Sequence, residues 1–277
     1  MAVGPLITLA EHTRLCNALR TGLPVIDVTL DLGRSQVAVA PHPDGWRWQD
    51  QTYPYLESCR DRTVYHWSGA AFEPVARFTQ SLIKLVPTAW GPPTFEIDGI
   101  KMLPTSKLSP WIDAQQKVAL IAPRGKRILD TCGGLGYFAA CAIAAGAKQV
   151  DSYEKNADVL WLRGLNPWSP AAAPPLALTH GDVSVNIQTL TNDSFDAALH
   201  DPPRFGIAGE LYSQDFYDQL ARVLKRGAPL FHYTGAPNSR SRARDLPGEV
   251  ATRLQRAGFE TRRSGDGLLA VNRRRRG

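Results

Sequence analysis

One short stretch, residues 127–138, constrains the fold of this chain more than any other. It reads Arg-Ile-Leu-Asp-Thr-Cys-Gly-Gly-Leu-Gly-Tyr-Phe, an apolar strand pattern that ends at Asp130, followed by a glycine-rich turn and an alanine-rich helix pattern over residues 138–145. Glycines allow a sharp turn and a close approach of ligand to backbone, and a helix N-terminus supplies free N–H groups. This order of elements is typical of the first strand of an α/β sheet that binds a nucleotide-like ligand.

Three further apolar strand patterns end in an acidic residue. They are residues 149–154, ending at Glu154, residues 176–182, ending at Asp182, and residues 195–201, ending at Asp201. Because the carboxyl ends of parallel strands meet at one edge of a sheet, we expect these acids and Asp130 to line one crevice. Glu154 follows the glycine-rich turn at about the 20-residue spacing at which a carboxylate accepts both hydroxyls of a ribose.

Residues 125–272 resemble the class I S-adenosylmethionine-dependent methyltransferases, which have a Rossmann-like sheet with an antiparallel seventh strand. The family's first motif, which wraps the methionine part of the cofactor, matches Asp130 through Tyr137. Its ribose-binding acid matches Glu154, and the acid that contacts the adenine amino group matches Asp182. The resemblance therefore implies that S-adenosylmethionine, as co-substrate, is bound by Asp130, Cys132, Gly133, Gly134, Gly136, Tyr137, Glu154 and Asp182.

The fourth motif of the family, (Asp/Asn)-Pro-Pro-(aromatic), places the catalytic group at the substrate side. It matches Asp201, Pro202 and Pro203, and Arg204 stands where the aromatic residue is usual. The resemblance implies that Asp201 orients or deprotonates a nucleophile. Dehydrogenases fit less well, because their fingerprint needs a third glycine and because Asp130 would repel a pyrophosphate.

A second resemblance covers residues 201–217, which are similar to the stretch after the fourth strand in the polyamine aminopropyltransferases. It implies that Glu210 and Tyr212 contact an amine substrate. The chain departs from those enzymes at Leu135, where they carry an additional acid in the first glycine loop, and at the fourth strand, where Asp201 has no second acid nearby. A polycationic substrate needs paired carboxylates to offset its desolvation, and methyl transfer is therefore preferred.

We thus expect a methyltransferase that acts on a nucleophilic nitrogen, on RNA or on a small amine. Arg204 favours an anionic neighbour, whereas Glu210 and Tyr212 favour a cationic amine. The alternatives are an aminopropyltransferase that uses decarboxylated S-adenosylmethionine, like spermidine synthase, and a non-catalytic protein that binds the cofactor or RNA. The oligomeric state is left open, with a homodimer among the alternatives.

The expected domain organisation follows from the change of pattern along the chain. A smaller β-rich (α+β) substrate or cap domain is expected over residues 1–104, a linker and lead-in helix over 105–124, the Rossmann-like α/β domain with its seven-stranded sheet over 125–272, and a basic tail over 273–277. Within the first domain, the patterns predict helices over 8–21 and 72–85, strands at 46–48 and 63–67, and hairpins over 25–40 and 94–102. The aromatic residues Trp46, Trp48, Tyr53, Tyr55 and Trp67 are interpreted as a packed core rather than a substrate wall.

Composition limits the remaining choices. The 277 residues carry a net charge of +6 and four cysteines without metal-ligand spacing. No apolar run approaches the roughly 18 to 20 residues needed to cross a bilayer, and the N-terminus lacks a signal-peptide pattern. We therefore expect a cytoplasmic protein with reduced thiols, no membrane contact and no metal. The C-terminal third is rich in arginine, which favours a solvated tail and, less strongly, contacts with RNA phosphates; these arginines are Arg240, Arg242, Arg244, Arg253, Arg256, Arg262, Arg263 and Arg273 to Arg276.

Overall fold

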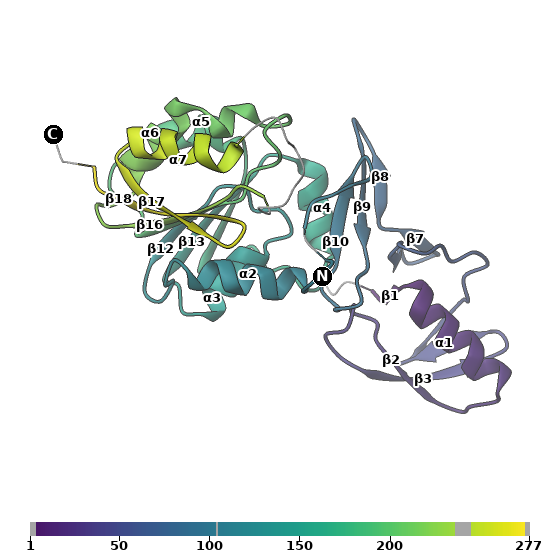
Figure 1. Ribbon diagram of the computed structural model, residues 1–277. Helices are drawn as coiled ribbons and strands as arrows, with labels where there is room; N and C mark the ends of the chain where they lie inside the picture. The colour runs from purple at the N-terminus through teal and green to yellow at the C-terminus, as the bar shows by residue number, and fades with distance from the viewer. Residues whose placement is uncertain (1–3, 104, 236–244, 275–277) are drawn as a thin grey trace. The chain divides into compact units, whose positions relative to one another are not determined.

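The computed structural model describes residues 4–103, 105–235 and 245–274 (Figure 1). The chain divides into two compact units. One unit takes in the residues up to Trp111 together with residues 161–169, and the other takes in residues 112–160 and the chain from Pro170 onward. The expected role of residues 105–124 as an interdomain linker stays a prediction.

The second unit is built on one large sheet. Its strands are β12 (Arg127–Asp130), β13 (Gln149–Glu154), β14 (Leu176–His180), β15 (Ala197–His200), β16 (Pro229–Tyr233), β17 (Phe259–Ser264) and β18 (Gly267–Asn272). They lie in the order β14-β13-β12-β15-β16-β18-β17. The first five run parallel. β18 is antiparallel to β16, and β17 at the edge is antiparallel to β18, so β17 runs in the direction of the first five. The prediction of an α/β fold with a large, mostly parallel sheet is confirmed.

Helices cover both faces of this sheet. They are α2 (Pro110–Ala119), α3 (Tyr137–Ala144), α4 (Ala157–Leu165), α5 (Val183–Asn186), α6 (Gln214–Val223) and α7 (Leu246–Arg256), with short 3₁₀ turns η1 (Ile187–Thr189) and η2 (Gly209–Tyr212). Figure 1 shows α5, α6 and α7 on one face and α2 and α3 on the other. This layering is that of an α/β sheet buried on both sides.

Helix α6 shows how the sequence specifies such a layer. Ser213 caps its N-terminus by accepting a hydrogen bond from the Phe216 amide at 3.1 Å. Phe216, Leu220 and Val223 recur at helical spacing and are buried against the sheet. The chain leaves the helix through Gly227, whose φ of 83° favours glycine.

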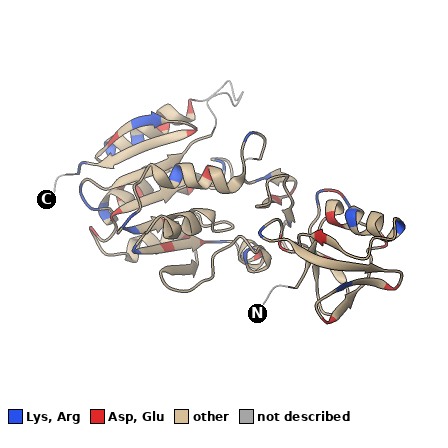
Figure 2. Ribbon diagram, turned by 90° about the horizontal axis from the view of Figure 1, so that it is seen from below, with Lys and Arg blue, Asp and Glu red and all other residues tan. Residues whose placement is uncertain are grey.

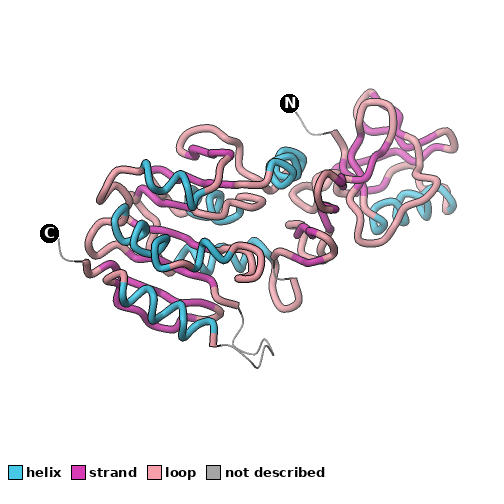
Figure 3. The backbone as a smooth tube through the Cα atoms, turned by 90° about the horizontal axis from the view of Figure 1, so that it is seen from above, coloured by secondary structure: helices cyan, strands magenta, loops and turns pink. Residues whose placement is uncertain are grey.

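Within the first unit, residues 4–103 form short antiparallel strands and the helix α1 (Leu9–Arg20) (Figure 3). The strands are β1 (Leu6–Ile7), β2 (Ile26–Val28), β3 (Val37–His42), β4 (Gly45–Trp48), β5 (Gln51–Tyr53), β6 (Tyr65–Trp67), β7 (Phe72–Pro74), β8 (Ala76–Phe78), β9 (Leu82–Val86), β10 (Thr94–Ile97) and β11 (Ile100–Lys101). They form three sheets, β1-β6-β7, β2-β3-β4-β5 and β11-β10-β9-β8. The expected hairpins are present as β2–β3 and β10–β11.

The helix predicted over residues 72–85 is wrong. This segment forms β7, β8 and most of β9. Its backbone hydrogen bonds join neighbouring strand segments rather than successive helical turns: the Val75 amide donates to the Val64 carbonyl at 2.8 Å, and the Leu85 amide donates to the Val75 carbonyl at 2.9 Å. Tertiary pairing has overridden an apolar spacing that fits a helix as well as short strands.

The aromatic residues of the first unit form a core, as the sequence indicated. Trp46 and Tyr53 are 1% and 4% exposed, and their rings stack with centroids 4.5 Å apart. Trp48, Tyr55 and Trp67 pack against this cluster with part of their surface exposed. These side chains therefore contribute buried apolar area rather than an open wall.

Candidate functional site

The glycine-rich turn between β12 and α3 has the backbone that its sequence predicts. Gly134 and Gly136 have φ values of 48° and 84°, in the left-handed region. The Gly133 amide donates to the Tyr153 carbonyl at 2.7 Å, and the Gly136 amide donates to the Gly133 carbonyl at the same distance. The turn is thus fixed against the end of β13.

Glu154, at the end of β13, binds this turn directly. Its Oε2 accepts a hydrogen bond from the Gly134 amide at 2.9 Å, and its Oε1 accepts one from the Asn156 amide at 2.8 Å. A carboxylate group offers about four acceptor sites on its two oxygens, which is the chemistry that ribose hydroxyls require. The structure therefore brings Glu154 and the glycine-rich turn together.

Asp182 follows β14 and caps α5. Its Oδ1 accepts from the Ser184 amide at 2.9 Å, and its Oδ2 lies 2.7 Å from Nζ of Lys155. Partial burial raises the pKa of Asp182, but the hydrogen bonds from Lys155 and Ser184 outweigh it and leave the pKa below the usual value. Nζ of Lys155 also lies 3.8 Å from Oε1 of Glu210, so one lysine connects two of the sequence-predicted site residues.

Three expected cofactor residues are more enclosed than a crevice lining requires. Asp130 is fully buried, and its Oδ2 accepts from the Ser152 hydroxyl at 2.8 Å. Tyr137 is 4% exposed. Burial raises the pKa of the Cys132 thiol well above its usual value, which argues against a thiolate nucleophile. The parallel pairing still places Asp130, Glu154, Asp182 and Asp201 at one edge of the sheet.

Asp201 is the most perturbed carboxyl group at this edge. It follows β15 directly and is half-buried. Burial raises its pKa to about 7, with Asp113, Asp266 and Asp130 adding to the increase and the Lys117 ammonium opposing it. A carboxyl group that titrates near neutral pH suits acid–base chemistry.

The rest of the motif after Asp201 lies mainly at the surface. Pro202 is buried, whereas Pro203 and Arg204 are exposed. The Tyr212 hydroxyl donates to the Pro203 carbonyl at 2.9 Å, and Tyr212 itself is 2% exposed. Tyr212 therefore closes the 201–212 loop onto itself, while its expected contact with an amine substrate stays a prediction.

Sequence reasoning missed the cluster around Lys117. Nζ of Lys117, on α2, lies 2.8 Å from Oδ2 of Asp113 and 3.4 Å from Oδ2 of Asp266, in the turn between β17 and β18. It also lies 4.3 Å from the ring centroid of Tyr233 at the end of β16. The i,i+4 spacing of Asp113 and Lys117 was readable in the sequence. The contact with Asp266 was not, because it depends on how the last hairpin closes the sheet.

A second missed feature is a pair of buried histidines beneath Asp201. The Thr131 hydroxyl lies 2.7 Å from Nδ1 of His200, whose Nε2 lies 3.1 Å from the Leu211 carbonyl. Nε2 must donate to that carbonyl, and burial lowers the pKa of His200 well below its usual value. In the resulting neutral imidazole, Nδ1 is the acceptor that faces the Thr131 hydroxyl. His200 thereby ties the residue before Asp201 to the glycine-rich turn and to η2.

His232 on β16 packs edge-on against His200, with ring centroids 4.4 Å apart. Its Nδ1 donates to the Tyr233 carbonyl at 2.7 Å, and its Nε2 accepts from the Tyr217 hydroxyl at 2.9 Å. Burial lowers the pKa of His232 to about 4 and that of His200 well below its usual value. Both imidazoles are therefore neutral supports of the sheet edge.

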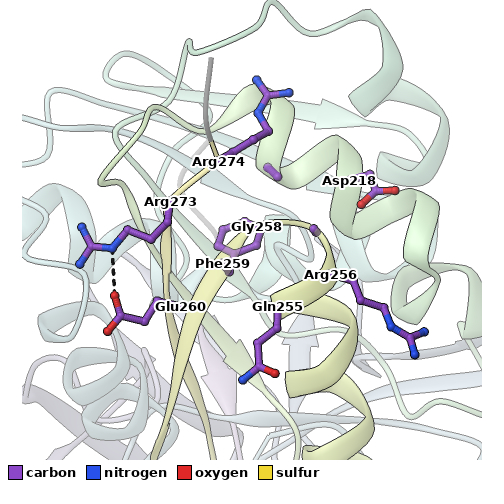
Figure 4. Close-up of a pocket in the computed structure, with 10 residues that line it drawn as sticks. Asp218, Gln255, Arg256, Gly258, Phe259, Glu260, Arg273 and Arg274 are labelled. Atoms are coloured by element: carbon purple, nitrogen blue, oxygen red, sulfur yellow. Dashed lines mark hydrogen bonds and ion pairs between the residues drawn. The ribbon is translucent and has the colours of Figure 1, made fainter. Parts of the chain in front are cut away.

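The arginine-rich C-terminal third lies partly at the opposite edge of the sheet. A pocket of about 690 Å³ opens there, between the ends of α6 and α7 and the start of β17 (Figure 4). Arg256, Arg273 and Arg274 line it together with Asp218 and Glu260, and Nε of Arg273 lies 2.9 Å from Oε2 of Glu260. Figure 2 shows Lys and Arg interspersed with Asp and Glu over the chain. Arg240, Arg242, Arg244, Arg275 and Arg276 lie outside the described residues.

In the described ranges, no group of three or more His, Cys, Asp or Glu side chains is arranged to hold a metal ion. None of the helices described is both long and apolar enough to cross a bilayer.

The parallel strand order, the glycine-rich turn and the acids at one edge define a class I S-adenosylmethionine-dependent methyltransferase-like fold. Solved structures of spermidine synthases have a similar fold. A spermidine synthase in complex with the transition-state analogue AdoDATO superimposes with a TM-score of 0.57 and 14% identity, over 71% of this chain and 72% of that one. The spermidine synthase of Thermotoga maritima gives 0.56 and 16%, over 71% of each chain. A probable spermidine synthase from Corynebacterium glutamicum gives 0.54 and 18%, over 71% and 79%.

Sequence comparisons add one relative. An uncharacterized protein of Methanocaldococcus jannaschii is 44% identical over 178 residues, which are 64% of this chain and 61% of that protein. The match therefore spans less than two thirds of the relative. No family model matches the chain.

Proposed function

We propose that this protein transfers the methyl group of S-adenosylmethionine to a nucleophilic nitrogen. The observation that carries the proposal is the placement of Asp201, whose pKa is raised to about 7, at the same sheet edge as Glu154 and the glycine-rich turn. The Asp201 carboxyl group is suited to proton transfer, and the Glu154 carboxylate is suited to binding a ribose. Between them lies the edge at which α/β sheets bind their ligands.

The donor side follows from the hydrogen bonds around the turn. Glu154 accepts the ribose hydroxyls while it keeps its bond to the Gly134 amide, so binding needs little rearrangement. Asp182 accepts the adenine amino group after its ion pair with Lys155 loosens. Asp130 is fully buried beneath the turn, and its Oδ2 accepts a hydrogen bond from the Ser152 hydroxyl.

The transfer itself is an in-line displacement. The nitrogen lone pair forms the new N–C bond as the C–S bond breaks, and the sulfur leaves as a neutral thioether. The proton released from nitrogen goes to the Asp201 carboxylate. Because the sulfonium is already activated, the protein contributes mainly alignment and one proton acceptor.

The acceptor class is an amine nitrogen, either on a small molecule or on RNA. The exposed Arg204 beside the motif suits a phosphate or carboxylate on the acceptor. Glu210, whose side chain is 46% exposed, suits a cationic amine. The two residues lie in one loop, so a molecule with both charges is compatible with the site.

Aminopropyl transfer is the second candidate. It is favoured by the fold likeness, since spermidine synthases superimpose on 71% of the chain. It is disfavoured by Leu135, which is 1% exposed and apolar at the position where an additional acid is expected of such enzymes. A non-catalytic role in binding the cofactor or RNA is the third alternative.

Product analysis with two donors separates these functions. The protein is incubated with S-adenosylmethionine or with its decarboxylated form, together with small amines or bulk RNA. S-Adenosylhomocysteine as product supports methyl transfer, whereas methylthioadenosine from the decarboxylated donor supports aminopropyl transfer and overturns the first proposal. Asp201→Asn should abolish either product while retaining donor binding; binding without turnover in the wild type would indicate the non-catalytic alternative.

A further inference from the structure

The ammonium group of Lys117 is buried and surrounded by carboxylates. The side chain is 5% exposed, and the group lies 2.8 Å from Oδ2 of Asp113 and 3.4 Å from Oδ2 of Asp266. Burial alone would lower the pKa of Lys117, but Asp201, Asp113 and Asp266 reverse this and raise it above the usual value. Lys117 is therefore a permanent positive charge at neutral pH.

This charge lies at the strand ends from which Asp201 emerges. His200 pairs with His232 in the parallel register of β15 and β16, so the next residues, Asp201 and Tyr233, are neighbours at the strand ends. Nζ of Lys117 lies 4.3 Å from the ring centroid of Tyr233. Asp201 is also the largest charged influence on Lys117, and Lys117 is the largest on Asp201.

Apart from Lys117, the charged groups around Asp201 disfavour its ionisation, because they are carboxylates. The titratable groups that interact with it lie on α2, the β17–β18 turn, β12, the glycine-rich turn, η2 and β16, and are Lys117, Asp113, Asp266, Asp130, Tyr212, Tyr233 and Cys132. Only Lys117 among them is a cation. Without it, Asp201 would ionise next to three carboxylates in a partly desolvated site, which strongly disfavours the charged form.

We propose that Lys117 is a positioning residue that keeps a substantial fraction of Asp201 ionised, and thus able to accept a proton, near neutral pH. Asp113 on α2 and Asp266 in the β17–β18 turn hold the ammonium in place. Their negative charges also offset part of its effect on the pKa of Asp201. The inference rests on the proposed role of Asp201 as the proton acceptor. Through Asp266, the β17–β18 hairpin would then influence the pH at which Asp201 accepts a proton.

The charge balance predicts shifts of opposite sign for two substitutions. Lys117→Met removes the one cation and should move the titration midpoint of Asp201 upward by about one pH unit or more. Asp266→Asn removes a carboxylate and should move the midpoint downward. Lys225→Met serves as control, because Lys225 pairs with Asp196 and is 48% exposed; it should leave the midpoint unchanged.

The experiment follows the Asp201 carboxyl carbon by NMR in ¹³C-aspartate-labelled full-length protein, with Asp201→Asn identifying its signal. Opposite shifts in the two variants support the inference, since loosened packing does not produce opposite signs. An unchanged midpoint in Asp266→Asn, or a midpoint in Lys117→Met that stays or falls, overturns it. If Lys117→Met does not fold, Lys117→Gln, which also removes the charge but keeps a polar side chain, takes its place with the same expected upward shift. Turnover retained in Asp201→Asn would instead contradict the proposed function, whatever the titration shows.

Discussion

Asp201 combines a fixed backbone with an adjustable charge. Its neighbour His200 is held by Thr131 and by the Leu211 carbonyl, and Pro202 restricts the backbone that follows. Burial raises the carboxyl pKa to about 7. The side chain is therefore held in place, while its protonation state changes close to physiological pH.

This predicts a specific pH dependence of turnover. A proton acceptor must be ionised, so kcat/KM should increase about tenfold per pH unit up to about pH 7 and level off above it. Asp201→Asn should lower kcat by about 10² to 10⁴. Initial rates between pH 5 and 9 measure both effects, and a flat wild-type profile below pH 7 would contradict the assignment.

Site residues that end a strand could be placed from the sequence. Glu154, Asp182 and Asp201 could be assigned to one edge because parallel strands share their polarity. Lys117 and Asp266 could not, because their contact joins α2 to a hairpin about 150 residues later in the chain. The tautomers of His200 and His232 likewise depend on carbonyl groups that only the folded chain brings within reach.

Among the elements, the β12–α3 turn depends on the backbone freedom of glycine. Gly136 has a φ of 84° at the N-cap of α3. Gly136→Ala should cost about 1–2 kcal/mol of stability because a Cβ is strained in this conformation, and it should weaken binding of S-adenosylmethionine. Gly164→Ala is the control: Gly164 lies in α4 with open space around its Cβ position, so this substitution should be neutral or slightly stabilising. Denaturant unfolding compares the two, and equal effects would show that the turn conformation is unimportant.

The buried histidine on β16 predicts a loss of stability in acid. The pKa of His232 is lowered to about 4 in the folded protein, against about 6.5 when unfolded. The neutral form is therefore favoured by folding, and its contribution is present above pH 6.5 and is lost as the pH falls towards 4. The unfolding free energy of the wild type should fall by roughly 1.4 kcal/mol per pH unit more steeply in this window than that of His232→Gln. His180→Gln, at an exposed position, should follow the wild type; parallel curves for all three proteins would contradict the prediction.

Element prediction succeeded where a pattern is long and local. The strands and helices of residues 125–272 follow turn glycines and apolar runs closely, as at α6 and Gly227. It failed over residues 72–85, where Phe72, Val75 and Leu85 are spaced for a helix but lie in short antiparallel strand pairings. Short strands obtain their stability from neighbours, which a single sequence does not specify.

At the scale of the whole molecule, the distribution of arginine bears on the acceptor. Arg256, Arg273 and Arg274 gather near one pocket at the edge opposite Asp201, where Asp218 and Glu260 offset part of their charge. A phosphate-binding surface would bind RNA with an affinity that falls steeply with salt.

A salt titration against bulk RNA tests this surface. If the acceptor is RNA, binding should be present at low salt and weaken by at least tenfold between about 50 and 200 mM salt. Replacing Arg256, Arg273 and Arg274 by Gln should reduce the slope of log affinity against log salt by up to about three. Absence of binding even at low salt would leave a small amine as the acceptor.

Calorimetry with S-adenosylmethionine measures binding at the proposed donor site directly. Glu154→Ala should weaken binding by about 10- to 100-fold, because hydrogen bonds to a charged group contribute about 1.5–3 kcal/mol. Glu210→Ala, an exposed acid at the same sheet edge, should leave the affinity within about twofold of the wild type. We expect the wild type to give a saturable isotherm and Glu154→Ala alone to lose it. Unchanged affinity in Glu154→Ala, or no binding by the wild type, would contradict the proposed donor site.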